Sequence, residues 1–522
     1  MASVNVDTHV TATDQALCRL YAVRPVWDGV QSAAEAVELP AMTLLHAGPP
    51  FADPTRPSAP VLASAVLCCL YEGWAESEAK AEALIASGQV RLMPAQHYRV
   101  VTPLGAVISP STQLVRVIDA AHPGHPACWS LLSSGAGPQI RFGTRSPEVL
   151  PRLAWRDGPL AEALRLALNH SPVALIPLAI IGLAGGDDLH SRTTVATRAL
   201  LSELSRTLDD PAVVAMLEAT PLFFLTLWMA ACFLMLDATR DQEASLVLAL
   251  AGNGTDAGVR LSNDPDHWIT TAAHVPDGPR LTASVAEACP MLGDSGVIDA
   301  AGFGAQAWFH CTEVASGMRG WLPGVPAARP RWLVGEHPLF EPFRLGSAID
   351  ARQVTADRQT PRVAIAMLDA QGREGLLGRG ICQTDPALFG VDAATPGMAI
   401  NEPSTLATLH RLFERYELAL TSNDVAELDT LFWDSPHTVR YGAGEHLYGY
   451  EAIQAFRRAR PGAGLERALE QRSITTFGNR FAVTHMVFSR VGEPRLGRQT
   501  QSWACIDGHW RIVAAHVSWM DL

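Results

Sequence analysis

Two glycine-rich segments, 250–263 and 290–306, restrict most strongly what this chain of 522 residues can fold into. The second reads PMLGDSGVIDAAGFGAQ, and its glycines leave too little room for a regular helix or strand. Glycine lets the backbone approach a ligand closely and lets successive N–H groups converge on an anion. Together the segments predict a small-anion site that includes Asn253, Asp294 and Ser295. Taken singly, each is better explained as turns between strands.

The overall composition indicates a large globular protein. A chain of this length is expected to form three or four packing units. Its residues are 48% hydrophobic and 18% charged, and the formal net charge is −13. This acidic balance argues against nucleic acid and anionic membrane surfaces as partners.

The basic residues are almost all arginine, because Lys80 is the only lysine among 40 lysines and arginines. Lys80 lies in the charged run AESEAKAEAL, where we expect a solvated helix face. Walker-type phosphate loops, Schiff-base enzymes and pyridoxal-phosphate enzymes all need a lysine in the site. We therefore expect no such cofactor, and no other cofactor. Any carboxylate or phosphate must be held by arginine, histidine or backbone N–H groups.

The cysteines and the apolar runs indicate the compartment. The 9 cysteines are scattered, contain no C-x-x-C pair and predict no metal site, which suits a reducing compartment. The start of the chain lacks the basic and apolar regions of a signal peptide. The most apolar run, 222–236, is shorter than the roughly 20 residues that span a bilayer, so we expect a buried helix there. The sequence thus predicts a cytoplasmic protein.

The order of the predicted elements indicates a multidomain α/β and α+β protein. We expect two α/β units flanking a helical subdomain, then a linker and a C-terminal α+β domain. The predicted ranges are 1–150, 151–250 and 251–390 for these three parts, 391–403 for the linker and 404–522 for the last domain. Within them, 12–39, 58–73 and 75–87 are expected to be helical, 348–354 to form a strand, and 362–381 a hairpin.

Several motifs upstream of residue 391 resemble one family of enzymes. They are TLLHAGPP (43–50), CLYEGWAESEA (69–79), IRFG (140–143), GDDLHSRT (186–193), AGNGTDAGVRLS (251–262) and LGDSGVIDAAGFG (292–304). Over residues 20–390 the chain resembles the family of the G subunit of the oxamate carbamoyltransferase of anaerobic allantoin breakdown. The resemblance implies carbamoyl transfer between oxalurate and phosphate, giving oxamate and carbamoyl phosphate. It also implies a ureide-catabolic complex of three different subunits.

The motifs supply candidates for binding these small anions. The substrate-binding candidates in this part are His46, Gly48, Glu72, His97, Asp187, His190, Asn253, Asp294, Ser295, Asp350 and Arg352. Arg352 or Arg141 would hold a carboxylate or phosphate. One of the three histidines could protonate the leaving amide nitrogen of oxamate. The alternatives are structural: histidines satisfied by their neighbours, Glu72 bracing the next helix, and Asp187 as a helix N-cap.

Residues 404–522 show the pattern of a domain with three helices and a mixed sheet. The helix at 404–420 is expected to have Ser404 as N-cap and an apolar stripe that contains Tyr416. A second helix, a short strand at 437–441 and a third helix follow in that order, and four strands between 466 and 518 end the domain. This is the layout of the nuclear-transport-factor-two-like (NTF2-like) cone. Alternation in the last strand predicts one shared face for Trp510, Ile512, Ala514, His516 and Ser518.

Motifs in this last domain point to one branch of that superfamily. They are LFWDSPHTVRYGAGEHLYGYEAI, FRRAR, ITTFGNRFA, GRQTQSW and WRIVAAHVSW. The domain resembles the AtzH-like and HpxZ-like branch, found with ureide and triazine catabolism genes. The resemblance implies a decarboxylating amidohydrolase site for N-carboxylated ureas, in which Tyr416 relays a proton and Arg440 holds a carboxylate. Arg498 and His516 are further candidates. The alternative is a structural ion pair of Arg440 in a domain that only forms a homodimer.

Three functions remain open at this point. The first is one component of a carbamoyltransferase complex, with other subunits of that enzyme as partners and a fused domain that binds a small anion. The second is an amidohydrolase centred on Tyr416 and Arg440. The third is a non-catalytic scaffold subunit.

Overall fold

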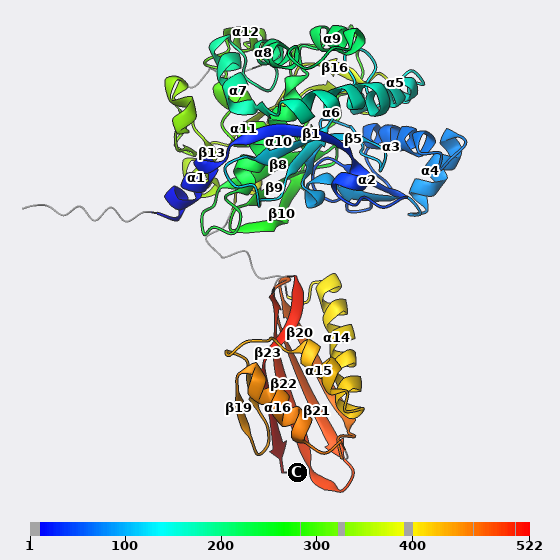
Figure 1. Ribbon diagram of the computed structural model, residues 1–522, viewed down its shortest axis with the longest axis vertical. Helices are drawn as coiled ribbons and strands as arrows, with labels where there is room; N and C mark the ends of the chain where they lie inside the picture. Colours follow the sequence, from blue (N-terminus) through cyan, green and yellow to red (C-terminus); the bar gives the residue numbers. More distant parts are fainter. Residues whose placement is uncertain are drawn as a thin grey trace, which may run out of the picture. The chain divides into compact units, whose positions relative to one another are not determined.

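The computed structural model describes residues 11–281, 283–321, 329–390, 400–462, 464–506 and 508–521. The chain divides into two compact units, Met1–Val391 and Asp392–Leu522, called the head and the cone below (Figure 1). The predicted linker, 391–403, lies outside the described residues up to 399. Its described end belongs to the cone, because the Asn401 N–H donates to the Thr476 carbonyl over 3.1 Å.

A five-stranded sheet in the order β4-β6-β5-β1-β7 forms the first layer of the head. Its strands are β1 (Pro25–Ser32), β4 (Val100–Val101), β5 (Gln113–Asp119), β6 (Cys128–Leu131) and β7 (Val173–Ala174). The prediction that 12–39 is helical was wrong in its middle, since only α1 (Ala12–Ala22) and α2 (Ala33–Ala36) are helices. Trp27 and Val30 are buried when β1 pairs with β5, and this packing outweighs local helix preference.

Two parallel strands complete the N-terminal part of the head. β2 (Thr43–His46) pairs with β3 (Arg91–Pro94), and α3 (Ala59–Tyr71) and α4 (Glu78–Ala86) connect them. The two helices confirm the predictions for 58–73 and 75–87. The Ser77 hydroxyl caps α4, and Gly88 follows that helix with a φ of 72°.

Helices dominate residues 149–237. They are α5 (Val149–Trp155), α6 (Ala161–His170), α7 (Leu175–Ala184), α8 (Thr194–Leu204), α9 (Pro211–Glu218) and α10 (Phe224–Asp237). Every residue of α10 is buried, and the helix packs against β5 and β6 as well as the later strand β8. The apolar run is therefore a central helix of the head, as predicted. Within the described residues, no helix is both long and apolar enough to cross a bilayer.

The glycine-rich segments belong to a four-stranded sheet in the order β10-β9-β8-β11. Its strands are β8 (Val247–Asn253), β9 (Asp256–Leu261), β10 (Asp264–Ala272) and β11 (Leu292–Gly293). A short helix, α11 (Gly296–Ala300), follows β11. The expectation that 290–306 has no regular structure was therefore wrong. Short elements fit there because Gly293, Gly302 and Gly304 turn the chain with φ of 134°, 86° and 57°.

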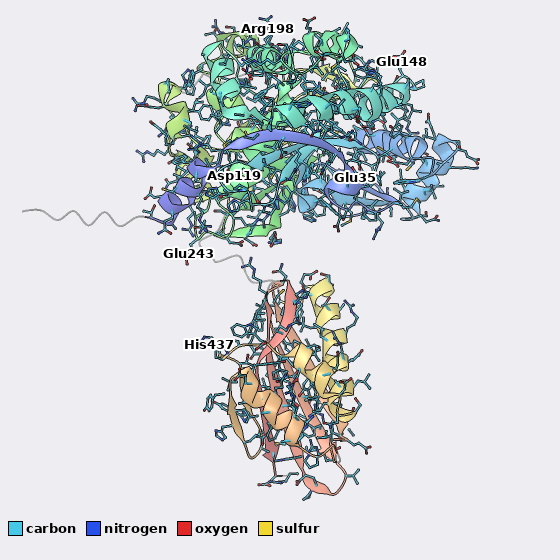
Figure 2. All side chains as sticks on the ribbon, viewed as in Figure 1. Glu35, Asp119, Glu148, Arg198, Glu243 and His437 are labelled. Carbon is cyan, nitrogen blue, oxygen red and sulfur yellow. The ribbon has the colours of Figure 1, made fainter. Side chains whose placement is uncertain are left out.

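The head ends in short strands and turns. Its remaining elements include α12 (Thr312–Gly317), β12 (Leu333–Val334), β13 (Ala348–Ile349), α13 (Ala351–Asp357), β14 (Arg362–Ala364), β15 (Met367–Leu368), β16 (Leu376–Gly378) and β17 (Ile381–Gln383). Pairing of β14 with β17 and of β15 with β16 confirms the hairpin at 362–381. The strand predicted for 348–354 was wrong after Ile349, because the Asp350 carboxylate caps α13. Exposed charged side chains such as Glu35, Glu148 and Arg198 lie on the outside of the head (Figure 2).

The cone packs helices against a six-stranded sheet in the order β19-β18-β23-β22-β21-β20. Its elements are α14 (Pro403–Thr421), α15 (Val425–Leu431), β18 (Val439–Tyr441), β19 (His446–Tyr448), α16 (Tyr450–Ala459), β20 (Ala468–Phe477), β21 (Phe481–Arg490), β22 (Glu493–Ile506) and β23 (His509–Met520). The sequence missed β19. The N-cap of α14 is Glu402 rather than Ser404, since its carboxylate accepts from the Ser404 and Thr405 N–H groups.

The last strand of the cone contains a β-bulge. At Val513 the register of β23 against β22 slips by one residue. The buried side chains on β23 are therefore Ile512 and Ala515, while His516 is exposed. The prediction that Ile512, Ala514 and His516 share one face was wrong, because strand alternation does not survive an extra residue.

Candidate functional site

A cleft in the head brings together residues from distant segments. Its inner part is a cavity of about 180 Å³, and a wider cavity of about 680 Å³ adjoins it. Both are lined by Arg141, Phe142, Ser191, Leu222, Leu376 and Arg379. The inner cavity is also lined by Leu104, His190, Leu225, Ser295 and Ala364. The predicted motifs IRFG, GDDLHSRT and LGDSGVIDAAGFG thus meet at one place.

Arg141 is held in this cleft by its backbone. It lies in the short turn Ile140–Phe142, which ends at Gly143 with a φ of 64°. A Cβ at Gly143 would come within 2.4 Å of Pro60, so a larger residue would disturb the turn. The Arg141 carbonyl also accepts from the Gly105 N–H over 3.0 Å. These contacts fix the point from which the guanidinium extends.

The Arg141 side chain has no anionic partner among the described residues. Its Nε is buried without a hydrogen-bond partner, and its guanidinium carbon lies 5.0 Å from the Phe142 ring centroid. Burial lowers the pKa of Arg141 to about 10, which leaves it charged at neutral pH. Arg379 adds a second guanidinium to the wall, and within the described ranges no ion pair is found for it. Partly buried charge without a partner is costly, so the cleft suits a small anion.

His190 and Asp299 form a buried pair on the wall of the same cleft. Nδ1 of His190 lies 2.7 Å from Oδ2 of Asp299, and the His190 side chain is 6% exposed. Oδ1 of Asp299 accepts from the Ala305 and Ala364 N–H groups over 2.8 and 3.1 Å. Burial raises the pKa of Asp299, while His190 and the two N–H groups oppose that shift. Asp299 and Arg379 were not among the predicted candidates. The sequence signal for Asp299 was that it is the second acid of the glycine-rich segment 290–306.

Two buried aspartates hold the loop that carries His190. Oδ2 of Asp187 accepts from N–H groups in the first turn of α8 over 2.8 and 2.9 Å. Asp188 accepts from the His190 N–H over 3.0 Å and from Trp308 Nε1 over 2.7 Å. Leu189 between Asp188 and His190 is buried with a φ of 64°. The N-cap residue of α8 is Thr193 and not Asp187, but the Asp187 carboxylate does bind N–H groups of the first turn, and the loop fixes His190 in place.

Ser295 lines the cleft, whereas its neighbour Asp294 serves the core. Asp294 is fully buried and accepts from the Gly48 and Thr102 N–H groups over 2.9 and 2.8 Å, and from the Gln96 amide over 2.7 Å. Burial raises the pKa of Asp294 to about 6 against the effect of these bonds. The predicted candidate Asp294 therefore joins separate segments of the core. Ser295 is the predicted residue of this segment that reaches the cavity.

Gly48 and Asn253 join two loops to each other. A Cβ at Gly48 would lie 2.4 Å from the carbonyl carbon of Gly252. Asn253 donates to the Pro49 carbonyl over 3.0 Å and accepts from the Thr255 N–H over 2.9 Å. The close approach that glycine permits here is to another stretch of backbone. The turn interpretation therefore accounts for the first glycine-rich segment.

The other two predicted histidines have different surroundings. His46 is fully buried, its Nδ1 lies 2.8 Å from the Ala47 carbonyl oxygen, and burial lowers its pKa to about 4. His97 is exposed, and desolvation on its packed side, followed by the Arg260 charge, lowers its pKa. Of the three predicted histidines, His190 lines the cleft.

The remaining candidates in the head make structural contacts or face solvent. Glu72 accepts from the N–H and hydroxyl of Ser111 over 2.8 and 2.9 Å, so its contact is with the turn before β5 and not with the next helix. Asp350 caps α13 and accepts from the Ser245 hydroxyl over 2.7 Å. Arg352 is exposed on α13. Of the two predicted anion-binding arginines, Arg141 is therefore the one in the cleft.

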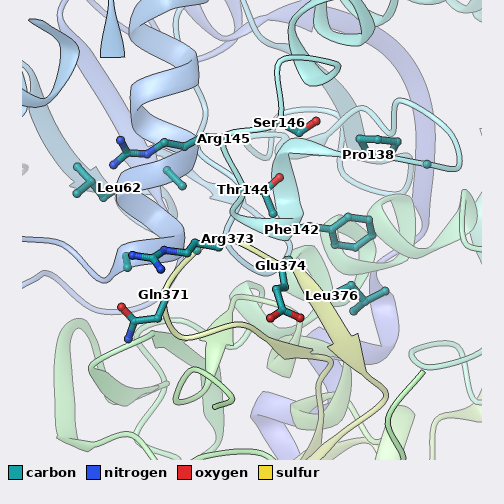
Figure 3. A pocket seen from close by; sticks show the side chains of 15 residues that line it. Leu62, Pro138, Phe142, Thr144, Arg145, Ser146, Gln371, Arg373, Glu374 and Leu376 are labelled. Atoms are coloured by element: carbon teal, nitrogen blue, oxygen red, sulfur yellow. The ribbon is translucent and has the colours of Figure 1, made fainter. Parts of the chain in front are cut away.

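An open cavity of about 810 Å³ shares Phe142 and Leu376 with the cleft (Figure 3). Arg145 on its wall pairs with Glu82 over 2.5 Å and with Glu78 over 3.2 Å. Its charge is thus compensated by protein carboxylates, unlike that of Arg141. Phe142 and Leu376 form a wall common to the two cavities.

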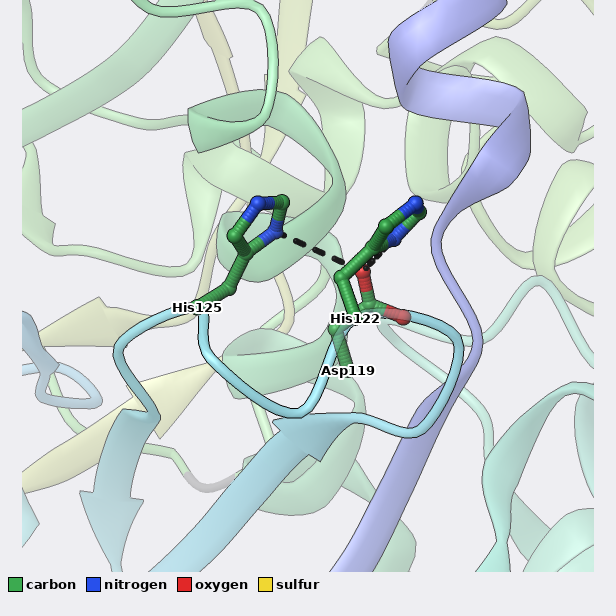
Figure 4. A group of neighbouring side chains, drawn as sticks. All are labelled: Asp119, His122 and His125. Carbon is green, nitrogen blue, oxygen red and sulfur yellow. Dashed lines mark hydrogen bonds and ion pairs between the residues drawn. The ribbon is translucent and has the colours of Figure 1, made fainter.

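Asp119, His122 and His125 form a group that could hold a divalent cation (Figure 4). One ligand atom from each lies within 4.8 Å of the others. Nδ1 of His122 and of His125 lie 2.7 and 3.7 Å from Oδ2 of Asp119. The other oxygen of Asp119 accepts from the Arg24 and Ala121 N–H groups over 2.9 and 3.0 Å. A hydrogen-bonded turn accounts for these contacts, and both imidazoles are exposed.

In the cone, Tyr416 lies on the buried face of α14, as its stripe predicts. Its hydroxyl accepts from the Gln499 amide over 2.9 Å. Gln499 accepts in turn from Arg467 over 2.8 Å, and Nε of Arg467 donates to Glu417 over 2.9 Å. The tyrosine hydroxyl is therefore the end of a buried polar network.

Arg440 and two arginines not predicted from the sequence lie in the same part of the cone. Nη1 of Arg440 lies 2.5 Å from Glu445, which is an ion pair of the kind the structural alternative predicts. Arg460 and Arg490 have buried Nε atoms without partners. Burial lowers the pKa of both, and nearby charges act on Arg460 from Arg440 and Arg490. The FRRAR motif contains Arg460, but nothing in it indicates which arginine points inward.

The two further candidates in the cone face outward. Arg498 is exposed between buried Gly497 and Gln499 on β22. His516 is exposed beyond the bulge, with its ring 6.1 Å from that of Tyr441. The structure thus brings Tyr416 and Arg440, but not Arg498 and His516, toward the interior.

Comparison with known proteins separates the same two parts of the chain. The family model described as oxamate carbamoyltransferase subunit AllG matches residues 90–295, and the AtzH-like model matches residues 398–522. The oxamate carbamoyltransferase subunit AllG of Escherichia coli K12 is 33% identical over 391 residues, covering 70% of this chain and 92% of that protein. The uncharacterized protein YahG of the same organism is 27% identical over 406 residues, covering 73% and 85%.

Solved structures show a similar fold for the head. A conserved protein of unknown function from Enterococcus faecalis V583 has a TM-score of 0.64 at 22% identity, and the match covers 72% of this chain and 95% of that one. A protein of unknown function from Pectobacterium atrosepticum is 54% identical over 24% of this chain and 98% of its own, with a TM-score of 0.24. The chain belongs to the AllG family of oxamate carbamoyltransferase subunits and carries an AtzH-like domain at its C-terminal end.

Proposed function

We propose that this chain is a subunit of an oxamate carbamoyltransferase-like enzyme that converts oxalurate and phosphate to oxamate and carbamoyl phosphate. The observation that carries the proposal is the cleft in which Arg141 and Arg379 have no anionic partner among the described residues. All four reactants and products are small anions, and each would supply the missing negative charge. Membership of the AllG family supports the same reaction.

The size of the cleft fits such ligands. Its inner cavity of about 180 Å³ is smaller than the roughly 300–1,000 Å³ of sites for drug-sized molecules. Ser191 and Ser295 on its wall offer hydroxyl groups for a carboxylate, a ureide or a phosphate. The adjoining cavity of about 680 Å³ leaves room for entry or for a second reactant.

We also propose a metabolic setting and partner proteins for this chain. The enzyme would act in ureide catabolism of the allantoin type in the cytoplasm, together with the other carbamoyltransferase subunits. The cone would bind a small anion of the same chemical class and would form a homodimer.

The test is carbamoyl phosphate formation by the complex purified with its native partner subunits. With oxalurate and phosphate supplied, the wild-type complex should produce carbamoyl phosphate and oxamate. Arg141→Met keeps an unbranched apolar stem but removes the guanidinium and its charge. It should lower kcat/KM roughly 10- to 100-fold, since a charged hydrogen bond to the anion is lost.

Arg352→Met is the matched control, because Arg352 is exposed on α13. This variant should keep the wild-type kcat/KM. Absence of carbamoyl phosphate with the wild-type complex would overturn the proposed reaction. Equal activity of the Arg141 variant and wild type would remove this cleft from it.

A second candidate function rests on the cone. The buried, partnerless Nε atoms of Arg460 and Arg490 favour an anion site there, together with Tyr416 and Arg440. In a decarboxylating amidohydrolase these groups would bind an N-carboxylated urea. Tyr416→Phe should then abolish carbon dioxide release from such a urea, and unchanged release would exclude the idea. A scaffold subunit would show neither activity nor ligand binding in either unit.

A further inference from the structure

We infer that His190, oriented by Asp299, is the proton-transfer group of carbamoyl transfer in the head, so that this subunit itself carries part of the chemistry. The inference rests on the proposed function, because it names a role within that reaction. Family membership alone leaves open which subunit holds the reacting groups. The geometry of the His190–Asp299 pair points to this one.

The hydrogen bond to Asp299 determines which edge of the imidazole is available. Nδ1 of His190 lies 2.7 Å from Oδ2 of Asp299, so the Nδ1–H donates to the carboxylate. Nε2 is on the opposite edge of the ring, and the His190 side chain lines the inner cavity. In this tautomer Nε2 carries a lone pair and can accept a proton.

Asp299 is itself fixed in position by neighbouring groups. Its Oδ1 is occupied by the Ala305 and Ala364 N–H groups, which leaves Oδ2 for His190. Gly304 packs so closely that a Cβ there would lie 2.7 Å from Oδ1 and 3.0 Å from Nδ1 of His190. Such an arrangement prevents rotation of the carboxylate and of the ring. A proton acceptor held in one orientation is what general acid–base catalysis requires.

The cleft places this acceptor beside positive charge. Arg141 and His190 line the same inner cavity, and the Arg141 charge has no counter-ion among the residues that the structure describes. An anion bound to Arg141 would therefore lie within reach of the wall that carries His190. Two anionic reactants repel each other in water, and guanidinium groups would reduce that repulsion.

The proposed step moves one carbamoyl group and one proton. A phosphate oxygen attacks the carbamoyl carbon of oxalurate, and its hydroxyl proton passes to Nε2 of His190. The C–N bond to the oxamate nitrogen then breaks, the nitrogen keeps the electron pair, and it receives the proton from Nε2. The products are carbamoyl phosphate and oxamate, and His190 returns to its neutral form. No oxidant, metal or further reactant takes part in this balance.

A purely structural role for His190 is the rival explanation, since the bond to Asp299 also joins the 186–193 loop to α11. His190→Asn separates the two roles. The asparagine amide can still donate to Asp299 from near the position of Nδ1, but it has no group at the position of Nε2. Asp299→Asn is the second variant, because an amide donor there favours the tautomer whose Nε2 bears the proton.

The experiment uses the complex with its native partner subunits, supplied with oxalurate and phosphate. Both variants should lower kcat about 10²- to 10⁴-fold with little change in KM for oxalurate. The pH profile of kcat should differ between wild type and His190→Asn, because the variant lacks the group that moves the proton. Thermal unfolding of both variants should remain near wild type. His97→Asn is the matched control and should keep full kcat.

The possible results distinguish failure of the proposed reaction from failure of the role assigned to His190. A wild-type complex that makes no carbamoyl phosphate overturns the proposed function, and the inference with it. An active wild type with full kcat in His190→Asn overturns the inference alone. A rise in KM without loss of kcat does so as well, because it reduces His190 to a binding residue.

Discussion

Arg260 and Asp294 lie on either side of Gln96, and the Gln96 side chain hydrogen-bonds to both. The Gln96 carbonyl oxygen accepts from Arg260 over 2.6 Å, and its amide donates to Asp294 over 2.7 Å. Burial lowers the pKa of Arg260 to about 10 and raises that of Asp294 to about 6. The two charges are thus joined through a neutral amide in the core of the head.

Replacing Gln96 by leucine should therefore destabilise the head strongly. Gln96→Leu removes two hydrogen bonds to buried charged groups, and the free energy of unfolding should fall by about 3 kcal/mol. Scanning calorimetry of the full chain would measure the loss as a lower Tm. Gln353→Leu, at an exposed position of α13, is the control and should leave Tm almost unchanged. Equal Tm values for the two variants would refute the bridging role.

The pH dependence of stability should report Asp294. Its pKa of about 6 in the folded state is above the roughly 3.9 of an unfolded aspartate. The folded state therefore binds the proton more tightly, and this contribution to stability declines as pH rises from about 4 to about 6. Asp294→Asn lacks the titration, so the Tm advantage of wild type over the variant should shrink across this window. Exposed Asp209→Asn should give a constant difference instead, and a constant difference for Asp294→Asn would contradict the prediction.

Gly304→Ala should impair the cleft through the His190–Asp299 pair. The new methyl group would lie 2.7 Å from Oδ1 of Asp299, at a backbone φ of 57° that favours glycine. Displacement of the pair should lower kcat about 10²-fold in the purified complex. Gly317→Ala is the control, because nothing lies within 4 Å of a Cβ there. Full activity of the Gly304 variant would mean that the His190–Asp299 pair is not tightly packed against residue 304.

Two glutamates on α14 should differ sharply in their effect on the cone. Glu417 pairs with Arg467, whose side chain is 2% exposed, whereas Glu414 pairs with Arg472 at side-chain exposures of 64% and 40%. Glu417→Gln leaves a buried guanidinium unpaired and should cost about 3 kcal/mol. Glu414→Gln should cost less than about 1 kcal/mol. Calorimetry of the two variants side by side measures the contrast, and similar losses would argue against the buried network.

Much of the local structure could be predicted from the sequence, since it depends on local patterns. The apolar run at 222–236 gave a buried helix, and the stripe containing Tyr416 gave the inner face of α14. Local patterns failed where a distant contact decides. β1 forms because Trp27 and Val30 pack in a sheet. The start of α13 is a different case, because the Asp350 carboxylate caps it through local contacts with the Arg352 and Gln353 N–H groups.

The candidate site could be predicted only in part for a similar reason. His190, Ser295 and Arg141 were recognisable as polar residues in motifs. Their meeting with Arg379 depends on the path of the chain between them, which no motif encodes. Asp294 and Asp299 have the same residue type in one glycine-rich segment. Only the directions of their side chains distinguish Asp294, which joins segments of the core, from Asp299, which pairs with His190.

The extra residue in β23 makes this strand tolerant of a one-residue deletion. Ala514, Ala515 and His516 pair with Ser502, Gln501 and Thr500 after the bulge. Removing Val513 would leave these pairs in place, so Ile512 and Ala515 would still face inward and His516 outward, now in plain alternation. A relative that lacks one residue at this point therefore keeps the same lining of the cone.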